Sequence, residues 1–403
     1  MSAGILAGRK VLELGTMLAA PFAAHILAQL GAEVIKIEPP AGDPTRSLVR
    51  GGPSGTYIAY SRGKKSLCLD LRAEAGQAVF QKLLAGADVV LHNLAPDSAR
   101  RLNVTYEACA QAKPDIVYCH IRGYGRGPLA NELASNPVAE AATGAMFGHR
   151  IEGRPSRLGP SYHDQFVGCY AVIGILGALM SGNAAPERRR IELGLYETGL
   201  HIAARDLAGV QLKTHLTGKA EQEPSGEFAM PGYGAYETAD GRWIYLVMLT
   251  DAHWRKFCNA TGPSDFDPSL ATLRQRKKQR GRVETLVKTA IGALTFDAAA
   301  AKLTAAGVGF TEVLSLDKVL EAPQAREPAK FTSLSLQGLP FELPDFPLIA
   351  EGGLGRDEAS PPLLGADTQA ILGSLGYDEA ETEALKTSGV VVAAIPGKPV
   401  WAP

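Results

Sequence analysis

The sequence lacks the features of several large protein classes. Its 403 residues carry a formal net charge of −1, so no overall field attracts nucleic acid or an anionic membrane. The longest apolar stretch, around residues 167–180, is too short and too rich in glycine to predict a membrane span. The first residues, MSAGILAGRKVLELG, lack the regions of a secretion signal. These absences predict a soluble cytoplasmic protein with no nucleic-acid or membrane partner.

Cysteine is scarce, and the cysteines are scattered. No CxxC and no Cys/His pair at metal-ligand spacing occurs, so no metal site is expected. An odd number of dispersed cysteines predicts reduced core residues in a cytoplasm. They are Cys68, Cys109, Cys119, Cys169 and Cys258.

Three nucleotide and hydrolase motifs are also missing. The chain contains no G-x-x-x-x-G-K-[ST] and no G-x-S-x-G, and the turn after residues 10–14 lacks G-x-G-x-x-G. The glycine-rich stretch 123–128 ends in Pro128 and opens no helical pattern, so it predicts a mobile loop rather than a phosphate cradle. A P-loop and an α/β-hydrolase nucleophile are excluded, and a dinucleotide on the first turn is disfavoured.

The first half of the chain alternates short apolar runs with helical patterns. Strands are expected at 10–14, 33–38, 66–70, 88–92 and 115–121, and helices at 21–31 and 74–85. Such repetition predicts a doubly wound parallel α/β sheet. Residues 165–215 have a mostly helical pattern.

The second half has a different pattern from about residue 226. Asp240-Gly241 lies between alternating apolar runs and predicts a hairpin. The basic stretch 274–282 predicts a solvated helix face, and residues 226–325 predict a smaller α+β domain. The stretch 340–362, rich in proline and glycine, predicts a connection. Two capped helices should follow, with Asp367 or Thr368 capping the first and Asp378 the second.

Arginines follow several of the expected strands. In the sequence, Arg72, Arg101 and Arg122 come after three of the apolar runs. Ligands of such sheets bind at the carboxyl ends of the strands. Each arginine alone is explained as a solvated side chain, whereas three at this position are consistent with an anionic ligand.

Asp164 is the reactive candidate that stands out by context. It belongs to the polar run 161–165, which leads directly into an apolar helical segment. A helix cap stabilising by about 1 kcal/mol explains an aspartate there fully. His163 is its chain neighbour and points elsewhere, and His120 lies in a strand pattern typical of a core histidine. The residues alone therefore favour a structural role for Asp164.

Longer stretches carry a resemblance. They include KVLELGTMLAAPFAAHILAQLGAEVIKIEPPAGDPTR, YSRGKKSLCLDLR, ADVVLHNLAPDSARRL, PDIVYCHIRGYGRGPLA, GPSYHDQFVGCYAVIGILGALM and YETADGRWIYLVMLTDAHWRKFC. With PPLLGADTQAILGSLGYDEAETEAL they make the chain resemble the family III CoA-transferases of the CaiB/BaiF type, over nearly its whole length. This group includes formyl-CoA transferase, carnitine CoA-transferase and the α-methylacyl-CoA racemases.

The resemblance implies an architecture. Residues 1–215 and 340–403 would build a Rossmann-like CoA-binding domain, residues 226–325 a small α+β domain, and residues 326–339 a linker. Two chains would interlock as linked rings in a homodimer.

The resemblance also implies site residues. Asp164 falls on the aspartate that acts as nucleophile in the transferases, through an aspartyl-CoA thioester and mixed anhydrides. Coenzyme A or an acyl-CoA would be bound as substrate, with no permanently bound cofactor. The matching CoA-binding positions are Met17, Leu18, Ala19, Leu69, Arg72, Asn93, Leu94, Arg101, Leu102, Arg122 and Tyr124. Pro39 stands where formyl-CoA transferase has an arginine, so that phosphate contact is not expected.

Departures from the family pattern indicate a subfamily. Ser135 and Asn136 replace the histidine and aspartate of the racemases, and neither exchanges protons at neutral pH, so transfer is favoured over racemisation. Asn136-Pro137 is similar to mesaconyl-CoA C1–C4 transferase (2-methylfumaryl-CoA isomerase), which moves CoA within one molecule. Intermolecular transfer from succinyl-CoA to a small, dicarboxylate-like acid is the leading hypothesis, intramolecular transfer is the second, and racemisation is third.

A dicarboxylate requires a cation for its distal charge. The candidates are Arg46, Arg50, Arg122 and Arg126, and Arg46 and Asn136 are the residues expected to contact the substrate. The stretch EQEPSGEFAMPGYG has no convincing counterpart of the glycine-rich loop of formyl-CoA transferase, so formate and oxalate are not expected as substrates.

Overall fold

The computed structural model describes residues 4–49, 52–182, 186–218, 230–262, 267–326, 331–336, 338–348 and 360–393. The chain forms two compact units. The large unit contains residues 1–211 and 331–403, and the small unit contains residues 212–330. The large unit is therefore built from both ends of the chain, with the small unit inserted between them.

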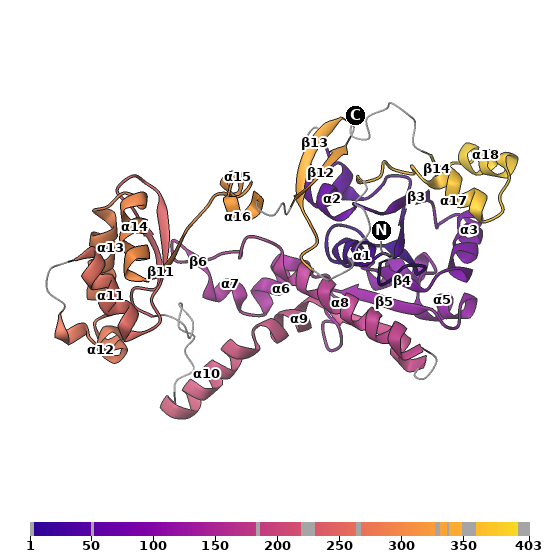
Figure 1. Ribbon diagram of the computed structural model, residues 1–403. Helices are drawn as coiled ribbons and strands as arrows, with labels where there is room; N and C mark the ends of the chain where they lie inside the picture. The colour runs from indigo at the N-terminus through magenta and orange to yellow at the C-terminus, as the bar shows by residue number, and fades with distance from the viewer. Residues whose placement is uncertain are drawn as a thin grey trace. The chain divides into compact units, whose positions relative to one another are not determined.

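A seven-stranded sheet organises the large unit (Figure 1). Its spatial order is β14-β3-β2-β1-β4-β5-β8, and all neighbours are parallel except β14 and β3. The strands are β1 (Lys10–Leu14), β2 (Glu33–Glu38), β3 (Lys65–Leu69), β4 (Val89–His92), β5 (Val117–Arg122), β8 (Arg190–Gly194) and β14 (Val391–Val392). The order reverses direction between β1 and β4, and open α/β sheets bind ligands at such a point.

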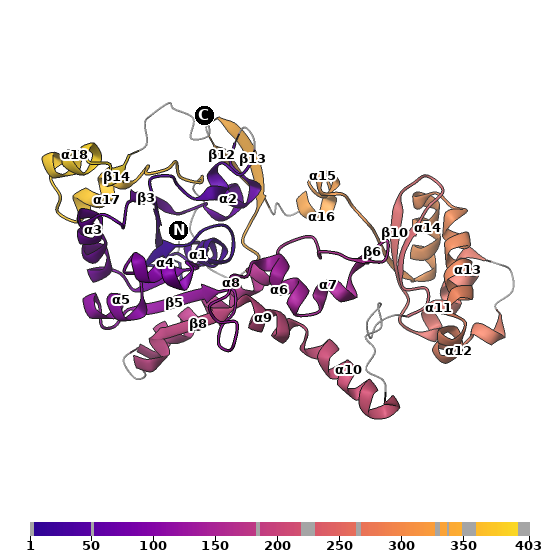
Figure 2. The same ribbon diagram turned by 180° about the vertical axis from the view of Figure 1, so that it is seen from behind.

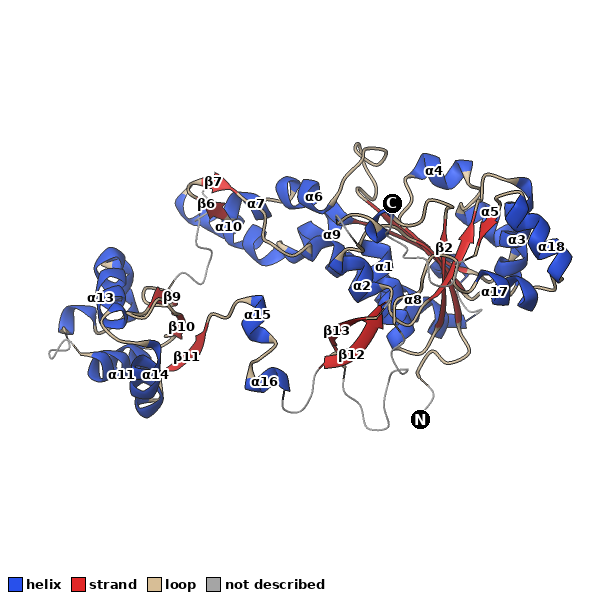
Figure 3. Ribbon diagram, turned by 90° about the horizontal axis from the view of Figure 1, so that it is seen from above, coloured by secondary structure: helices blue, strands red, loops and turns tan. Residues whose placement is uncertain are grey.

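Helices cover both faces of this sheet (Figures 2 and 3). On one face α1 (Ala19–Gln29) and α8 (Tyr162–Ser181) share a core with Val11 and Val34. On the other face α3 (Glu74–Ala85), α5 (Tyr106–Ala112) and α17 (Thr368–Ser374) share a core with Leu12 and Ile35. Alternate strand residues thus enter opposite cores, as the period of two in a strand requires.

The expected strands and helices of the first half agree with the structure within about two residues. Strands 10–14 and 33–38 and helix 74–85 have the bounds predicted for them. Strand β8 was missed, because residues 165–215 were expected to be mostly helical. This edge strand reads RIELG and is only partly buried, so it carries no strong apolar signal.

Helix α8 is 20 residues long and is the helix of the described chain that is apolar enough to cross a membrane. The expectation that this segment is too short is therefore wrong for the helix as formed. Its buried face packs on α1, β5 and β8, as a core helix does. Its other face exposes Phe166, Ile173 and Met180.

Shorter elements complete the large unit. They are η1 (Pro44–Arg46), α2 (Gly55–Tyr60), α4 (Pro96–Arg101), α6 (Asn136–Ala142), α7 (Ala145–Gly148), β6 (Arg150–Ile151), β7 (Arg154–Pro155), η3 (Pro186–Arg189), α9 (Leu195–Ile202) and α18 (Glu379–Thr387). Helix α10 (Ala204–Thr217) crosses the boundary between the units. A hairpin of β12 (Phe331–Leu336) and β13 (Leu339–Pro344) occupies most of the expected linker 326–339, so the linker prediction is wrong there.

The C-terminal segment joins the sheet through β14, which pairs antiparallel with β3. Asp378 caps α18 in a capping box with Glu381, as expected. Asp367 precedes α17, but its carboxylate accepts the backbone N–H of Ser66 at 2.8 Å instead of capping the helix. That bond ties the C-terminal segment to the start of β3.

The small unit is an antiparallel sheet, in the order β11-β10-β9, covered by helices. Its elements are β9 (Gly234–Glu237), β10 (Trp243–Val247), α11 (Asp251–Thr261), η4 (Pro268–Leu270), α12 (Leu273–Lys278), α13 (Arg280–Gly292), α14 (Phe296–Ala306), β11 (Gly309–Glu312), α15 (Leu316–Val319) and α16 (Pro323–Arg326). The predicted hairpin joins β9 to β10, with Gly241 at φ +76° in its turn. Arg276 is an exception in the predicted solvated face, because it is buried against Asp251.

The cysteines differ in burial. Cys68, Cys109 and Cys119 are buried, as expected of core residues, and Cys258 is half-buried. Cys169 is exposed on α8, so the expectation of a core position is wrong for this residue.

Candidate active site

Two turns meet at the point where the strand order reverses. Asn93, directly after β4, accepts the backbone N–H of Thr16 at 2.9 Å and donates to the Thr16 carbonyl at 2.8 Å. The next residue, Met17, has φ +63° and is 46% exposed. A residue other than glycine held in this region costs on the order of 1–3 kcal/mol, and such strain concentrates at functional sites. Asn93 therefore joins the two turns that flank the expected ligand crevice.

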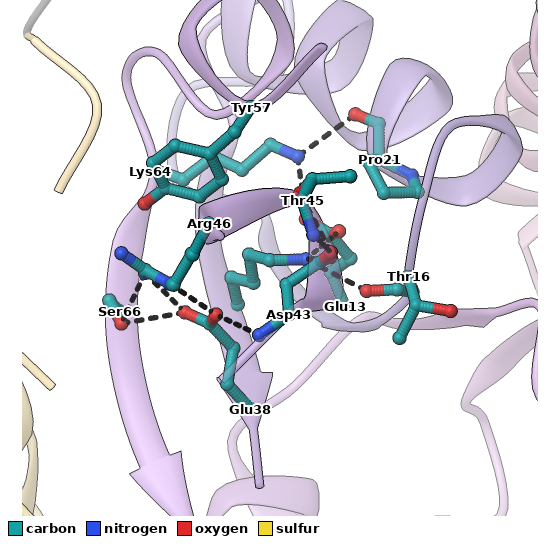
Figure 4. A network of polar contacts seen from close by, with 12 residues as sticks. Glu13, Thr16, Pro21, Glu38, Asp43, Thr45, Arg46, Tyr57, Lys64 and Ser66 are labelled. Atoms are coloured by element: carbon teal, nitrogen blue, oxygen red, sulfur yellow. Dashed lines mark hydrogen bonds and ion pairs between the residues drawn. The ribbon is translucent and has the colours of Figure 1, made fainter. Parts of the chain in front are cut away.

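A buried network of ion pairs and hydrogen bonds fixes the backbone on both sides of the β1–α1 turn (Figure 4). The Lys36 ammonium donates to Glu13 at 3.0 Å and to the Gly15 carbonyl at 2.7 Å. The Lys64 ammonium donates to Glu13 at 2.6 Å and to the Pro21 carbonyl at 2.9 Å. The two lysines thus hold both ends of the turn that carries Met17.

The same network continues through η1 (Figure 4). Asp43 pairs with Lys36 at 2.9 Å, and Glu38 forms a bidentate pair with Arg46 at 2.6 and 2.7 Å. Three buried carboxylates are thereby matched by three buried cations, because Glu13 pairs with Lys36 and Lys64. A matched set is what burial of charge requires.

Two stacked histidines hold the turn after β4. The backbone N–H of Leu94 donates to His92 Nδ1 at 3.2 Å, and His120 Nε2 donates to the Leu94 carbonyl at 2.8 Å. The rings of His92 and His120 stack with centroids 4.1 Å apart. Burial lowers the pKa of both histidines, so they remain neutral. The expectation of a satisfied core histidine at position 120 is confirmed.

Asp164 lies in the first turn of α8. It is not the cap, because Ser161 occupies that position and Asp164 is already helical. Its backbone N–H donates to Asn136 Oδ1 at 3.3 Å, beside that of His163 at 3.0 Å. Its carboxylate has no hydrogen bond or ion pair among the described residues. The interpretation of Asp164 as a helix cap is therefore wrong.

Packing brings Asp164 close to the β1–α1 turn. Helices α1 and α8 each connect parallel strands, so both begin at the carboxyl ends of the strands. A Cβ on Gly168 would lie 2.8 Å from Phe22 Cδ1 and 3.1 Å from the Ala19 carbonyl, so the two helices touch at this glycine. Asp164 is four residues earlier, about 6 Å along the axis. If the two helices keep this alignment, Asp164 is expected near the level of Met17.

The environment of Asp164 disfavours the charged carboxylate. Burial raises the pKa of Asp164 to about 6, Arg157 opposes the rise, and the Glu140 carboxylate adds to it. His163 is buried, donor or acceptor to Thr143 Oγ1 at 3.2 Å, and burial lowers its pKa. A half-buried, unpaired carboxylate with a pKa shifted toward neutrality is typical of a catalytic group.

The other residues expected to bind CoA follow several strand ends. Leu18 precedes α1 and Ala19 is its buried first residue, while Leu69 is buried at the end of β3. Leu102 is partly buried after α4, and Tyr124 follows β5 with its ring 5.5 Å from that of Tyr196. The structure thus brings turns from β1, β4 and β5 to one edge of the sheet.

The three arginines differ in position and partners. Arg72 follows β3 and is exposed, with its guanidinium on Asp70 at 2.7 and 2.8 Å. Arg122 ends β5, and its guanidinium donates to the Ala130 carbonyl. Arg101 is at the end of α4 and not at a strand end, so the expectation of a common position is wrong for it.

Arg46 does not have a free guanidinium. It is 4% exposed and is bound by Glu38, the Pro362 carbonyl and the ring of Tyr57. The prediction that Arg46 contacts the substrate is therefore not supported, because its donors are used inside the fold. Arg126 is exposed, and Arg50 lies outside the described residues.

Asn136 also has a structural position. It is 3% exposed, its Oδ1 accepts the two amides of α8, and its Nδ2 donates to Glu140. The expectation that Asn136 contacts the substrate is wrong for this structure, because both ends of its amide have partners. The α8 amides that could have stabilised an oxyanion are likewise occupied.

Two acidic residues of this region were missed at the sequence level. Glu140 is fully buried on α6, and Glu197 of α9 accepts the backbone N–H of Gly125 at 2.9 Å. The bond anchors the start of the glycine-rich stretch 123–128, whose mobility remains a prediction. A charged residue one turn after Asn136 on an apolar helix was the signal for Glu140.

Comparison with known proteins decides the family. The model of CoA-transferase family III matches residues 6–368. The chain belongs to CoA-transferase family III. Succinyl-CoA–D-citramalate CoA-transferase of Chloroflexus aurantiacus is 30% identical over 69% of this chain and 70% of its own length. Formyl-CoA:oxalate CoA-transferase of Streptomyces coelicolor is 26% identical over 97% of this chain and 100% of its own length.

A solved structure agrees in fold. The CaiB/BaiF family protein from Brucella suis superposes with a TM-score of 0.80 at 25% identity, over 93% of this chain and all of that one. Membership of the family makes this CoA-transferase an enzyme that acts on CoA thioesters. Among the described residues, no group of three or more His, Cys, Asp or Glu is placed to hold a metal ion.

Proposed function

We propose that this CoA-transferase moves CoA from succinyl-CoA to a small, dicarboxylate-like acid, with Asp164 as covalent nucleophile. The observation that carries the proposal is the unpaired Asp164 carboxylate in the first turn of α8, the helix that packs on α1 just after the Met17 turn. The relative named for succinyl-CoA and D-citramalate supports the donor and the class of acceptor. No resident cofactor is needed, since CoA enters as substrate.

The proposed reaction has four steps that balance without a redox partner. An Asp164 oxygen attacks the thioester carbon of succinyl-CoA, the C–S bond breaks, and CoA leaves as thiolate. The thiolate attacks the Asp164 carbonyl of the mixed anhydride, which releases succinate and leaves an aspartyl-CoA thioester. The acceptor carboxylate attacks that thioester and releases the thiolate again. The thiolate then attacks the acceptor carbonyl of the second anhydride, which frees Asp164.

Two alternatives differ from this proposal in the reaction that follows binding of the CoA thioester. Intramolecular transfer uses the same nucleophile and is distinguished by turnover without any added acid. Racemisation needs a base at position 135 or 136, and Asn136 is buried between Glu140 and α8. Oxalate is kept among the acceptors to be tested. The stretch used against it lies mostly outside the described residues, and the formyl-CoA:oxalate relative aligns over 97% of this chain.

The proposal includes a cytoplasmic homodimer. The exposed fractions of Ile173 and Met180 on α8 are 63% and 88%, and those of Leu212 and Leu216 on α10 are 61% and 76%. Exposed apolar side chains on α8, whose other face forms core, favour a protein interface, and α10 adds further exposed leucines. A second copy of the chain is the proposed partner, beside acyl-CoA and a small carboxylic acid, with no nucleic acid or membrane.

Label exchange between succinate and succinyl-CoA tests the donor half of the reaction without knowledge of the acceptor. Wild-type protein is expected to move isotope from labelled succinate into succinyl-CoA, because the first two steps are reversible. Asp164→Asn should abolish the exchange. Equal exchange in wild type and Asp164→Asn would refute the nucleophile, and no exchange in wild type would refute the donor. The rate with added D-citramalate, mesaconate or oxalate then ranks the acceptors.

A further inference from the structure

Glu140 is a buried carboxylate without a cation. It is fully buried on α6, and its oxygens accept from Asn136 Nδ2 and from the backbone N–H of Leu158 at 3.3 Å. No ion pair to Glu140 exists among the described residues. Glu140 differs in this respect from the buried carboxylates of Figure 4, because Glu13 and Glu38 are each paired with a buried lysine or arginine. An unmatched buried charge costs several kcal/mol, so a compensating benefit is expected.

Asn136 connects Glu140 with the first turn of α8. Its Nδ2 is fixed toward Glu140, and this orientation turns its Oδ1 toward the backbone amides of His163 and Asp164. Asn136 lies on α6, but its side chain accepts two backbone amides in the first turn of α8, where a capping side chain would otherwise bond. Its hydrogen bond to Glu140 fixes this orientation. The negative charge of Glu140 therefore lies directly behind the turn that carries Asp164.

Few other charges act on Asp164. Arg157, in the segment before α8, is exposed and acts in the opposite direction to Glu140. The neighbouring His163 is kept neutral by burial, so it supplies no counter-charge. The titratable groups on the other helices packed here are engaged elsewhere: Tyr60 of α2 with Gln165, Glu197 of α9 with Gly125, and His201 of α9 with Tyr170.

We propose that Glu140, held by Asn136, is a positioning residue that makes Asp164 a stronger nucleophile. Through Asn136, the Glu140 carboxylate lies behind the turn that carries Asp164, and it repels the charged form of the Asp164 carboxylate. When Asp164 Oδ bonds to the thioester carbon and the C–S bond breaks, the negative charge leaves with the CoA thiolate and Asp164 becomes neutral in the anhydride. The repulsion is relieved in that step, so the covalent step is favoured. This inference rests on the proposed function.

The test is the pH profile of the donor half-reaction. Covalent adduct formation from succinyl-CoA is measured in single turnover by quenching and intact-protein mass spectrometry, from pH 4.5 to about 8.5. Glu140→Gln is expected to move the acid limb of the rate to lower pH by about one unit, because a like charge is removed. The plateau rate should fall several-fold, with the KM for succinyl-CoA unchanged.

Two further variants separate charge from shape. Glu140→Asp keeps the charge and should keep the acid limb near that of wild type. Glu33→Gln removes a carboxylate at the amino end of β2, the opposite edge of the sheet, and should leave the profile unchanged. Should Glu140→Gln fail to fold, Asn136→Leu combined with Glu140→Met removes the polar pair together, and it too should lower the acid limb.

The outcomes distinguish the two proposals. An unchanged acid limb in folded Glu140→Gln or in the double variant overturns the role of Glu140, while adduct formation by wild type leaves the proposed function standing. A shift of equal size in Glu140→Asp overturns the charge mechanism. Absence of any adduct in wild type overturns the proposed function itself.

Discussion

At the scale of single residues, the carboxylate proposed as nucleophile, Asp164, lies where burial disfavours its charged form. Its carboxylate is half-buried without a partner, and burial raises its pKa to about 6. The native state therefore binds this proton more tightly than the unfolded chain does. Its contribution to stability is largest below about pH 4 and is lost as the pH rises toward 6. At neutral pH the residue opposes folding, as is common for groups retained for activity.

Asp164→Asn should consequently separate activity from stability. Turnover is expected to fall by about a thousandfold or more, because the covalent relay has no substitute nucleophile. The melting temperature at pH 7.5 should stay the same or rise by about 2 °C, because an uncompensated charge is removed. Calorimetry and the exchange assay on the same sample measure both. A large loss of stability together with retained exchange would contradict this description.

The pH dependence follows from the same group. Only the ionised carboxylate attacks, so kcat/KM for succinyl-CoA should be constant above about pH 7 and fall about tenfold per pH unit below about pH 5. Steady-state rates over this range measure the inflection. An inflection near pH 4, the value of an unperturbed aspartate, would show that the site does not shift Asp164.

At the scale of elements, the β1–α1 turn depends on the network beneath it. Lys64 is fully buried and pairs with Glu13, whereas its chain neighbour Lys65 pairs with Glu33 at the surface. Lys64→Met should destabilise the fold by about 3–5 kcal/mol, because Glu13 loses one of its two cations. Lys65→Met is the matched control and should cost less than about 1 kcal/mol. Denaturant unfolding of both variants gives the difference, and equal values would contradict the importance of the network.

Sequence patterns predicted the helices and strands more accurately than they predicted the contacts between side chains. Strands β1 and β2 and helix α3 were predictable because their apolar periodicity is continuous. Edge strand β8 and the β12–β13 hairpin were not, since partly buried strands carry a weak pattern.

In the candidate site, too, some residues could be predicted from the sequence, whereas the partners of others are known only from the structure. Asp164 and the turn residues follow from the resemblance, and the structure adds the close packing of α8 on α1 at Gly168. Arg46 and Asn136 were assigned to substrate, but their partners Glu38 and Glu140 decide otherwise. Such partners are set by tertiary contacts that local pattern does not encode.

At the scale of the whole molecule, the exposed apolar face of α8 predicts self-association. Ile173→Glu should convert a dimer into monomers or prevent assembly, because a charge cannot be buried unpaired in an apolar interface. Ile5→Glu is the control, as Ile5 is also 63% exposed but lies at the start of the chain. Light scattering after gel filtration measures the mass. A wild-type mass equal to the 42.5 kDa chain would contradict the homodimer.

The covalent role of Asp164 is tested by trapping the proposed acyl or CoA adduct. Wild-type protein is incubated with succinyl-CoA, trapped with hydroxylamine or borohydride, digested, and analysed by mass spectrometry. A modification is expected on the peptide that contains Asp164, and none on that peptide from Asp164→Ala. An unmodified wild-type peptide, together with turnover retained by Asp164→Ala, would contradict the covalent role of Asp164.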